Sequence, residues 1–236
     1  MGCGAKPYLI VDRDEQPGYR AAMKTQRLPK RPPPRSRLEV DERRAQLLAI
    51  ARKFFSENAY DEVSIDAIAA AAGISKGLLY HYFPTKRDFY VAALREIAQQ
   101  LLTETTPPSS DVPVDERVRR GVETYLSFVE RRGTAYVALM RGGIGSDPEI
   151  AGVLEETRAG FLARMLEHLP AGVDGALART ALRGWIGFVE ATSLDWVERR
   201  AVPLSSLVEL LRTMLFEAMK EVARLTIAAK AGALAQ

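Results

Sequence analysis

The sequence predicts an all-α protein, in which a small N-terminal three-helix domain with a helix-turn-helix precedes a larger helical domain. Apolar residues recur at three- and four-residue steps through most of the chain, which is the period of amphipathic helices, and no segment shows a convincing strand pattern. Between residues 64 and 83, two short segments of this kind flank a glycine. The composition changes at residues 103–113, which are rich in Thr, Pro and Ser and predict a loop.

The first 37 residues are expected to form a flexible basic arm. Between residues 24 and 37 there is no acidic residue, and the prolines at 29 and 32–34 exclude a helix. The basic residues of this stretch are Lys24, Arg27, Lys30, Arg31, Arg35 and Arg37. Such an arm can lie along phosphates or enter a minor groove, and a solvating tail without a function is an equal alternative.

Residues 64–83 predict two short helices joined by a tight turn. Ser64 can accept an N–H group as the N-cap of the first helix, and Ser75 can cap the second helix in the same way. Gly73 lies between them, where a positive φ lets the chain reverse within a few residues. The apolar stripe of the first helix consists of Ile65, Ile68, Ala69 and Ala72.

The second of these helices combines an apolar anchor with a polar face. Leu79 and Phe83, four residues apart, are expected to be buried against the first helix. Lys76 and Tyr80 project from another face, beside His81. Two helices joined by such a turn form a helix-turn-helix, which presents one short helix to a DNA groove. The alternative is an ordinary hairpin of a helical core, which has no reason to carry Lys, Tyr and His together.

Residues 43–94 resemble the DNA-binding domain of the TetR family of transcriptional regulators. The family's first helix is similar to residues 47–55, its helix-turn-helix is similar to residues 64–83, and its fourth helix opens like residues 84–88. In the last of these segments, Thr85 and Asp88 have the spacing of a capping box.

The chain departs from the family's pattern in one place. The family usually ends its first helix with Gly-Tyr, whereas this chain has Ala59-Tyr60. An alanine in a left-handed cap costs ~1 kcal/mol, so we expect Asn58 to take the left-handed conformation in its place.

The resemblance implies that residues 38–94 form a DNA-binding domain in which Tyr80, Tyr82 and Lys86 contact the DNA backbone. Lys76 lies at the start of the recognition helix, where it either reads guanine or makes a non-specific phosphate contact. Leu78 can touch a thymine methyl group, and for His81 a solvated surface position is the alternative. The expected DNA-binding residues are Ser64, Ser75, Lys76, Gly77, Leu78, Tyr80, His81, Tyr82, Thr85 and Lys86.

The second half of the chain predicts further helices. Their expected ranges are 113–131, 134–141, 147–169, 175–199 and 203–230. Asp147 followed by a proline and a glutamate is a strong helix start, and Ser206 with Glu209 offers a capping box to the last helix. Residues 141–146 contain three glycines but lack the preceding strand and the Gly-Lys-Ser/Thr ending of a phosphate loop, so we expect a plain interhelical loop.

The helix over 175–199 has two apolar faces, which must both be covered. One face consists of Trp185, Phe188, Thr192 and Trp196, and the other of Leu182, Ile186, Val189 and Val197. One side can face a second subunit, because Gly184 and Gly187 allow close approach of another helix. The resemblance implies that the last two helices pair with their twins in a four-helix dimer interface. A monomeric bundle is the alternative.

The resemblance also implies that residues 95–236 bind a small effector as well as forming the dimer. The candidate lining residues are Tyr125, Phe128, Tyr136, Met140, Phe161, Met165, Trp185, Phe188, Asp195 and Trp196. Aromatic and Met side chains at helical spacing are more often ordinary core. Asp195 either meets a cationic ligand or pairs with Arg199 one turn later, and we favour the ion pair. A mainly apolar and aromatic lining suggests a hydrophobic or amphipathic effector.

Several classes of protein and site are excluded or disfavoured. The chain has one Cys and two His, far apart in sequence, so we expect no metal and no cofactor. No apolar run reaches the ~18–20 residues of a membrane span, and no signal peptide is evident, so we expect a cytoplasmic protein without a membrane partner. No nucleophile–base pair supports an enzyme.

Taken together, the sequence and the resemblance predict a homodimeric, sequence-specific transcriptional regulator. We expect a repressor that binds double-stranded operator DNA with near-palindromic half-sites and is released from it by the small effector. An architectural DNA-binding protein without sequence preference is the main alternative.

Overall fold

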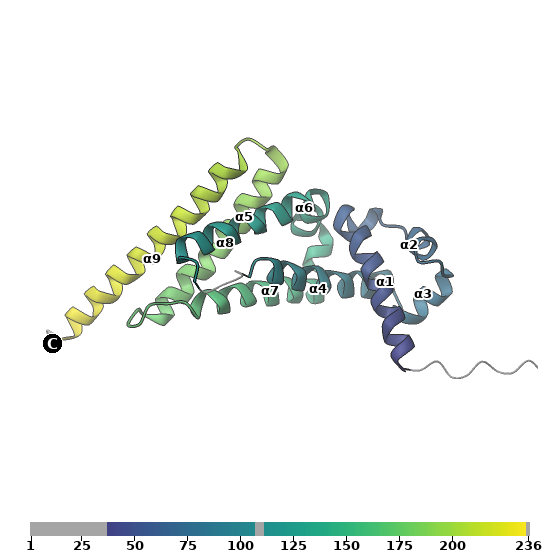
Figure 1. Cartoon of the computed structure of the whole chain (residues 1–236), viewed down its shortest axis with the longest axis horizontal. Coiled ribbons are helices and arrows are strands. Elements are labelled where there is room, and N and C mark those ends of the chain that lie inside the picture. The colour runs from purple at the N-terminus through teal and green to yellow at the C-terminus, as the bar shows by residue number, and fades with distance from the viewer. Residues whose placement is uncertain (1–36, 107–110, 235–236) are drawn as a thin grey trace, which may run out of the picture. The chain divides into compact units, whose positions relative to one another are not determined.

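Two segments of the chain, residues 37–106 and 111–234, are described by the computed structural model. Both segments consist of α-helices and short 3-10 helices without any strand, which confirms the predicted all-α class (Figure 1). Residues 1–36, and with them most of the expected basic arm, lie outside the described residues.

The N-terminal helices enclose one apolar core. These helices are α1 (Arg37–Glu57), α2 (Ile65–Ala71), α3 (Lys76–Tyr82) and the first half of α4 (Lys86–Glu104). Leu47, Ile68, Leu79 and Phe89 provide one almost fully buried side chain from each helix. Helices as short as α2 and α3 are marginal in isolation, so this shared core is what stabilises them.

The end of α1 differs from the expectation for Asn58. Arg200 is the one non-glycine residue with a positive φ in the described part of the chain, so the left-handed conformation predicted for Asn58 is wrong. Asn58 instead donates twice to the Phe54 carbonyl, from its backbone N–H at 3.2 Å and from Nδ2 at 2.9 Å. Ala59 is extended, with φ −62° and ψ 150°, and its N–H donates to the Glu62 carboxylate, which opens the 3-10 helix η1 (Tyr60–Glu62).

The rest of the described chain is a set of longer helices. They are α5 (Val114–Glu130), α6 (Gly133–Arg141), α7 (Pro148–Leu166), α8 (Gly175–Arg199) and α9 (Leu204–Leu234). A short 3-10 helix, η2 (Gly143–Ser146), joins α6 to α7 where we expected a plain loop. The predicted start of α7 is confirmed, because Asp147 Oδ1 accepts the N–H groups of Glu149 and Ile150 at 3.0 and 3.4 Å.

The predicted end of α7 and the predicted cap of α9 are wrong. α7 stops at Leu166 and not at Leu169, because the proline that follows Leu169 disfavours the helical conformation before it. The last turn tightens instead, and the Leu169 N–H donates to the Leu166 carbonyl at 3.2 Å. α9 begins at Leu204, and the Ser206 N–H donates to the Pro203 carbonyl at 3.1 Å, so Ser206 lies inside the first turn and is not its N-cap.

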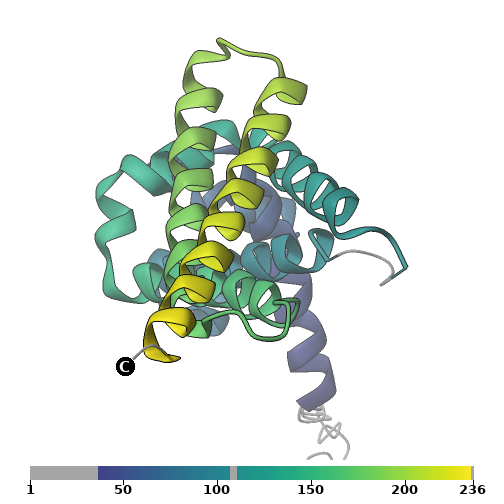
Figure 2. The ribbon, with the colours of Figure 1, turned by 90° about the vertical axis from the view of Figure 1, so that its left-hand side faces the viewer.

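α8 and α9 form a helical hairpin that packs against α5, and α8 also packs against α7. Figure 2 shows α8 and α9 side by side on the face turned towards the viewer. Two indole groups hold the hairpin together, since Trp185 Nε1 donates to the Leu211 carbonyl at 2.9 Å and Trp196 Nε1 donates to the Val202 carbonyl at 2.8 Å. Both buried donors are therefore satisfied, as polar atoms in an apolar core must be.

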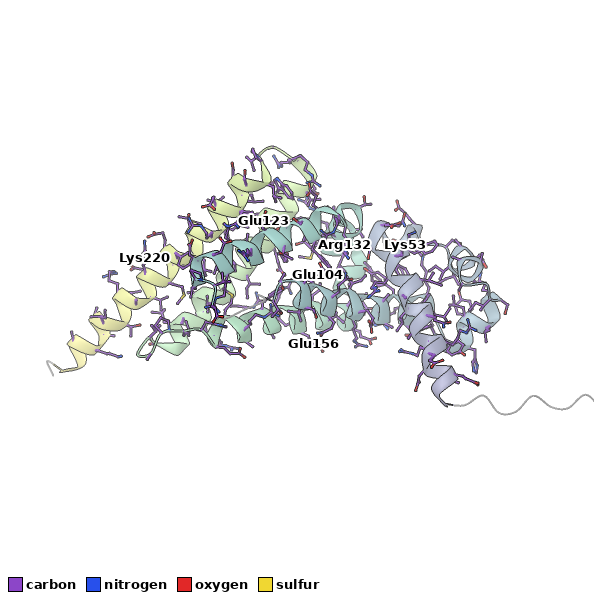
Figure 3. The ribbon with its side chains drawn as sticks, in the orientation of Figure 1. Lys53, Glu104, Glu123, Arg132, Glu156 and Lys220 are labelled. Atoms are coloured by element: carbon purple, nitrogen blue, oxygen red, sulfur yellow. The ribbon has the colours of Figure 1, made fainter. Side chains whose placement is uncertain are left out.

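Exposed charged side chains lie along the outer surfaces of the helices. Glu123 of α5, Glu156 of α7 and Lys220 of α9 are examples (Figure 3). Within the two described segments, no helix is both long and apolar enough to cross a membrane.

Candidate DNA-binding surface and effector site

The turn between α2 and α3 has the predicted local structure. Ser64 Oγ accepts the Ala67 N–H at 3.3 Å, and Ser75 Oγ accepts the Leu78 N–H at 3.2 Å, so each serine caps its helix. Gly73 has φ +64°, the left-handed conformation that the tight reversal requires. The caps and the glycine together fix the direction in which α3 leaves the core.

α3 has one buried anchor and a broad outer face. Leu79 is fully buried, whereas Lys76, Gly77 and His81 are exposed. Leu78, Tyr80 and Tyr82 are half-buried. A Cβ atom added to Gly77 would find no heavy atom closer than Ser75 Oγ at 4.0 Å, so the backbone is open to solvent there. The outer face of α3 thus presents residues that were expected to contact DNA.

Lys76 pairs with an acidic residue of the preceding helix. Its Nζ lies 2.9 Å from Asp66 Oδ2, and both side chains are largely exposed. The hydrogen bond with Asp66 raises the pKa of Lys76 above its usual value of 10.5. The ammonium group is therefore charged and oriented, but it has a carboxylate partner that DNA would have to displace.

Lys86 lies at the first position of α4 and contacts η1. Its Nζ lies 4.5 Å from the centre of the Tyr60 ring and 3.4 Å from the Asp61 carbonyl oxygen. Thr85 Oγ1 accepts the Asp88 N–H at 3.0 Å and Asp88 Oδ2 accepts the Thr85 N–H at 3.1 Å, which confirms the predicted capping box. A capped, positively polarised helix end with an adjoining cation is a suitable partner for a phosphate group.

A polar cluster lies among the helices of the second half. Tyr125 Oη of α5 lies 3.2 Å from Tyr136 Oη of α6. Nearby, Arg158 Nε of α7 donates to both carboxylate oxygens of Glu190 on α8, at 2.9 and 3.0 Å. Burial, with the Glu190 charge as a smaller cause, raises the pKa of Tyr136 to about 12 and that of Tyr125 well above its usual value. Both phenols therefore remain protonated and available for hydrogen bonds at neutral pH.

Apolar side chains surround this polar cluster, and several of them were expected to line an effector site. Tyr125, Trp185, Phe188 and Trp196 pack in one apolar cluster, and Phe161, Met165 and Trp185 pack in an adjoining one. Phe128 belongs to neither cluster, and the Arg132 guanidinium lies 3.5 Å from the centre of its ring. Met140 is half-buried on α6.

Asp195 does not share the buried face of α8 with the aromatic residues. Its side chain is 57 % exposed, and its Oδ1 lies 2.8 Å from Arg199 Nε. The favoured alternative, an ion pair one turn along the helix, is confirmed, and the placement of Asp195 on an apolar face is wrong. Glu190, whose side chain is 21 % exposed, is a half-buried carboxylate of α8 that the sequence did not indicate.

Two surface hollows lie away from the expected effector lining. One, of about 260 Å³, lies between the end of α4 and α5 and includes Thr105, Arg117 and Thr124. The other, of about 290 Å³, lies between α1 and α4 and includes Arg44 and Glu96. Neither hollow is lined by a residue of the expected effector set.

Over residues 37–106 and 111–234, no three His, Cys, Asp or Glu residues are grouped so that they could hold a metal ion.

The comparisons with known proteins agree in both halves of the chain. Residues 47–93 match the family model described as bacterial regulatory proteins, tetR family. Residues 114–218 match the model described as tetracyclin repressor-like, C-terminal domain. A crystal structure of a tetR-family transcriptional regulator from Streptomyces coelicolor is 34 % identical, with a TM-score of 0.72, over 81 % of this chain and 89 % of that one.

More distant relatives are also regulators. The transcriptional activator FasR of Mycolicibacterium smegmatis is 25 % identical over 178 residues, which cover 74 % of this chain and 81 % of FasR. The regulator EthR of the same organism is 26 % identical over 166 residues, covering 69 % of this chain and 74 % of EthR. The fold is shared with FadR of Bacillus subtilis, solved in complex with stearoyl-CoA, with 20 % identity and a TM-score of 0.56 over 72 % of this chain and 96 % of FadR.

Proposed function

The chain belongs to the TetR family of transcriptional regulators, which are DNA-binding proteins and not enzymes, and we propose that it is a homodimeric repressor released from a near-palindromic operator by a small effector. We assign DNA binding to residues 38–94, with residues 1–37 as a basic arm, and effector binding and dimerisation to residues 95–236. We place its action in the cytoplasm, with the chromosome.

The outer face of α3, which carries Lys76 and Gly77, is the observation on which the DNA-reading role rests. We propose base contacts from the start of this helix and phosphate contacts from Tyr80, Tyr82 and Lys86, because affinity comes mainly from phosphates and specificity from base edges. The half-buried tyrosines are supported from below, so their hydroxyl groups can be held towards a DNA backbone.

The outer face of the α8–α9 hairpin supports a dimer. Leu210, Met214 and Leu225 of α9 are each at least 40 % exposed, although they are large apolar side chains. On α8, Cβ atoms added to Gly184 and Gly187 would find no heavy atom within 4 Å, so these glycines leave room for a second helix. Two copies joined here would present two recognition helices, and half-sites about 34–36 Å apart would then be read together.

The Tyr125–Tyr136 and Arg158–Glu190 pairs indicate the chemical class of effector that would fit among these helices. A polar cluster within an apolar surround suits an amphipathic molecule, whose polar end would meet the phenols and the arginine. Effector binding would favour an arrangement of these helices that moves the two DNA-binding domains off the operator spacing. A ligand that favours this arrangement by ~1–3 kcal/mol would lower operator affinity about 5- to 150-fold.

The operator proposal is tested by footprinting the purified protein on the DNA that flanks its own gene. We expect protection of a near-palindromic segment, and a duplex with that segment should compete far better than a random duplex of equal length. Equal competition by both duplexes would favour the architectural alternative. A reporter placed behind the protected segment gives the sign of regulation, and higher output with the protein present would make it an activator, as FasR is named.

The effector proposal is tested with stearoyl-CoA as the probe, since FadR of Bacillus subtilis was solved with this molecule. We expect it to release the protein from the protected duplex, and Tyr125→Phe with Glu190→Gln to weaken that release without weakening DNA binding. Glu123→Gln, an exposed position of α5, is the matched control. Release that is identical in all variants would place the effector elsewhere.

A further inference from the structure

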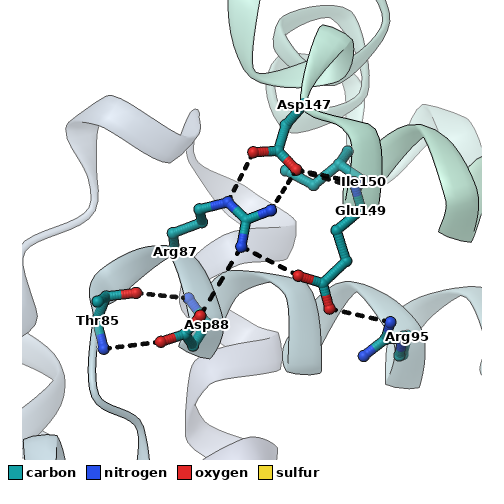
Figure 4. A network of polar contacts seen from close by, with 7 residues as sticks. All are labelled: Thr85, Arg87, Asp88, Arg95, Asp147, Glu149 and Ile150. Atoms are coloured by element: carbon teal, nitrogen blue, oxygen red, sulfur yellow. Dashed lines mark hydrogen bonds and ion pairs between the residues drawn. The ribbon is translucent and has the colours of Figure 1, made fainter.

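Arg87 joins the beginning of α4 to the beginning of α7. Its Nε donates to Asp147 Oδ2 and its Nη2 donates to Asp147 Oδ1, both at 2.6 Å (Figure 4). Its Nη1 donates to Glu149 Oε2 at 3.0 Å. A guanidinium that meets a carboxylate through two parallel hydrogen bonds fixes orientation as well as distance. This fork therefore defines how the first turn of α4 lies relative to α7.

The acceptors of the fork are themselves held in place. Asp147 is the N-cap of α7, since its Oδ1 also accepts the Glu149 and Ile150 N–H groups. Glu149 Oε1 accepts a second hydrogen bond, from Arg95 Nη2 at 3.1 Å, two turns further along α4 (Figure 4). α4 is thus attached to α7 at two points, and a rotation of its first turn would break the forked pair.

The same first turn carries the residues proposed to meet phosphate groups. Arg87 directly follows Thr85 and Lys86 in sequence, and Lys86 is the first residue of α4. Beneath them, Phe89 of α4 and Ile150 of α7 are fully buried members of one apolar core. The apolar core holds the two helices together, and the fork adds a directional contact at their beginnings.

We propose that Arg87 is a positioning residue for DNA binding: its forked pair with Asp147 holds Thr85, Lys86 and the α4 N-terminus in the orientation that meets the DNA backbone. This inference rests on the proposed phosphate role of that turn and goes beyond it. Arg87 acts here through its neighbours, not by touching DNA. If Arg87 has this role, a change of either Arg87 or Asp147 should weaken DNA binding.

The variant Asp147→Asn separates positioning from simple electrostatics. Asparagine is as good an N-cap as aspartate, so α7 keeps its cap while the forked ion pair is lost. Removing a negative charge should strengthen DNA binding if charge alone mattered. Positioning predicts the opposite, a loss of about 2- to 30-fold in affinity, which is the range of changes in coupling between packed elements. Asp115→Asn, in the first turn of α5 and paired with Arg212, is the matched control.

The experiment measures affinities for the footprinted duplex and for a random duplex over a range of salt concentrations. We expect Arg87→Gln, Asp147→Asn and the double variant to lose affinity for both duplexes by the same factor, and to share one salt slope, because each change misplaces the same phosphate contacts. Arg120→Gln, which loses an exposed ion pair with Glu116, should bind as the wild type does. Melting temperatures establish that each variant is folded. If a variant is not folded, Arg87→Lys, which keeps the charge but loses the fork, is measured in its place.

Two results would overturn the proposal. One is Asp147→Asn binding as tightly as the wild type or more tightly. The other is a salt slope that falls by about 1 for Arg87→Gln but stays at the wild-type value for Asp147→Asn, which marks a direct phosphate contact of Arg87. The sign of the Asp147→Asn effect can be read on the random duplex alone. Failure to find a protected segment would therefore count against the proposed operator and leave this test intact.

Discussion

Lys76 Nζ of α3 and Asp66 Oδ2 of α2 lie 2.9 Å apart on the exposed side of the helix-turn-helix. The pair connects the cation proposed to read bases with a carboxylate that repels phosphates. Its two members are ten residues apart, and each lies in the first turn of its own helix. We therefore expect the acid to limit the affinity of the recognition helix for DNA in general.

Replacing Asp66 with Asn should increase affinity for DNA. The lysine would lose its competing partner and the surface would lose a negative charge, so we expect about two- to fivefold tighter binding to a random duplex. Fluorescence anisotropy at fixed salt measures the change. Glu217→Gln, which removes the acid of an exposed Glu217–Lys220 pair on α9, alters net charge equally and should have no effect. Unchanged binding by Asp66→Asn would show that the pair does not oppose DNA.

Replacing Lys86 with Ala should weaken binding to all sequences. If its ammonium group neutralises one phosphate, the slope of log affinity against log salt concentration should fall by about 1. The measurement is a salt titration with the footprinted and the random duplex. Lys220→Ala on α9 is the control cation, since it is exposed and pairs with Glu217. A wild-type slope for Lys86→Ala would leave Lys86 with its contacts to Tyr60 and Asp61 as its only role.

Replacing Lys76 with Ala distinguishes its two possible contacts. A base reader should lose about 1–3 kcal/mol on the footprinted duplex, while binding to a random duplex changes little. A phosphate contact should lose the same amount on both. The comparison uses competition between the two duplexes, with Lys86→Ala as the example of uniform loss.

The local features of this surface could be predicted from sequence because each depends on neighbours within a few residues. Ser75, Gly73 and the Thr85–Asp88 box belong to this kind, and all three have the expected structure. The sequence shows that Ala59 departs from the family's pattern, but it does not show how the chain turns there. The turn depends on the side chain of Glu62, which accepts the Ala59 N–H and removes the need for a left-handed residue.

The pairs that join distant segments could not be predicted. Arg87 and Asp147 are 60 residues apart, and Arg158 and Glu190 are 32 residues apart. Helical periodicity places each of these charges on a surface, but it does not say which two helices meet. For the same reason Asp195 was selected on α8 in place of Glu190, since the helix has two apolar faces and the position of its neighbours decides which carboxylate is buried.

The forked pair should also give the protein a defined acid sensitivity. Arg87, with smaller contributions from the backbone N–H groups of α7, lowers the pKa of Asp147 from its usual 3.8 to about 2. A carboxyl group with a lowered pKa stabilises the folded state above its usual pKa, and this contribution is lost as the pH falls from about 4 to about 2. The fork should be insensitive to pH between 5 and 8.

The acid sensitivity can be measured as the melting temperature of wild type and Asp147→Asn between pH 5 and pH 2. We expect the melting temperature of the wild type to fall further below pH 4 than that of the variant, because the variant has no carboxylate to titrate at this position. Some loss should remain in the variant, because Glu116, whose pKa is lowered to about 2 by Arg119 and Arg120, titrates over a similar range. Superimposable profiles would mean that the fork does not contribute to stability.

The outer face of α8 makes the sharpest prediction about assembly. A Cβ atom at Gly184 or Gly187 meets open space within one chain, so Gly184→Leu should fold as the wild type does. In a close-packed dimer the same leucine would separate the two copies of the hairpin. Overpacking of a fitted interface typically costs 1–3 kcal/mol, so we expect the dimer dissociation constant to rise about 5- to 150-fold.

Light scattering during size-exclusion chromatography, over a series of protein concentrations, measures this change. Gly152→Leu is the matched control, because Gly152 lies within α7 and a Cβ atom there also meets open space. Affinity for the footprinted duplex should fall in Gly184→Leu together with dimerisation, since one recognition helix then acts alone. If Gly184→Leu remains a dimer while Leu210→Glu on α9 becomes a monomer, the copies meet through α9 without close approach of α8. If both variants match the wild type, the hairpin is not the interface and the exposed apolar residues of α9 require another partner.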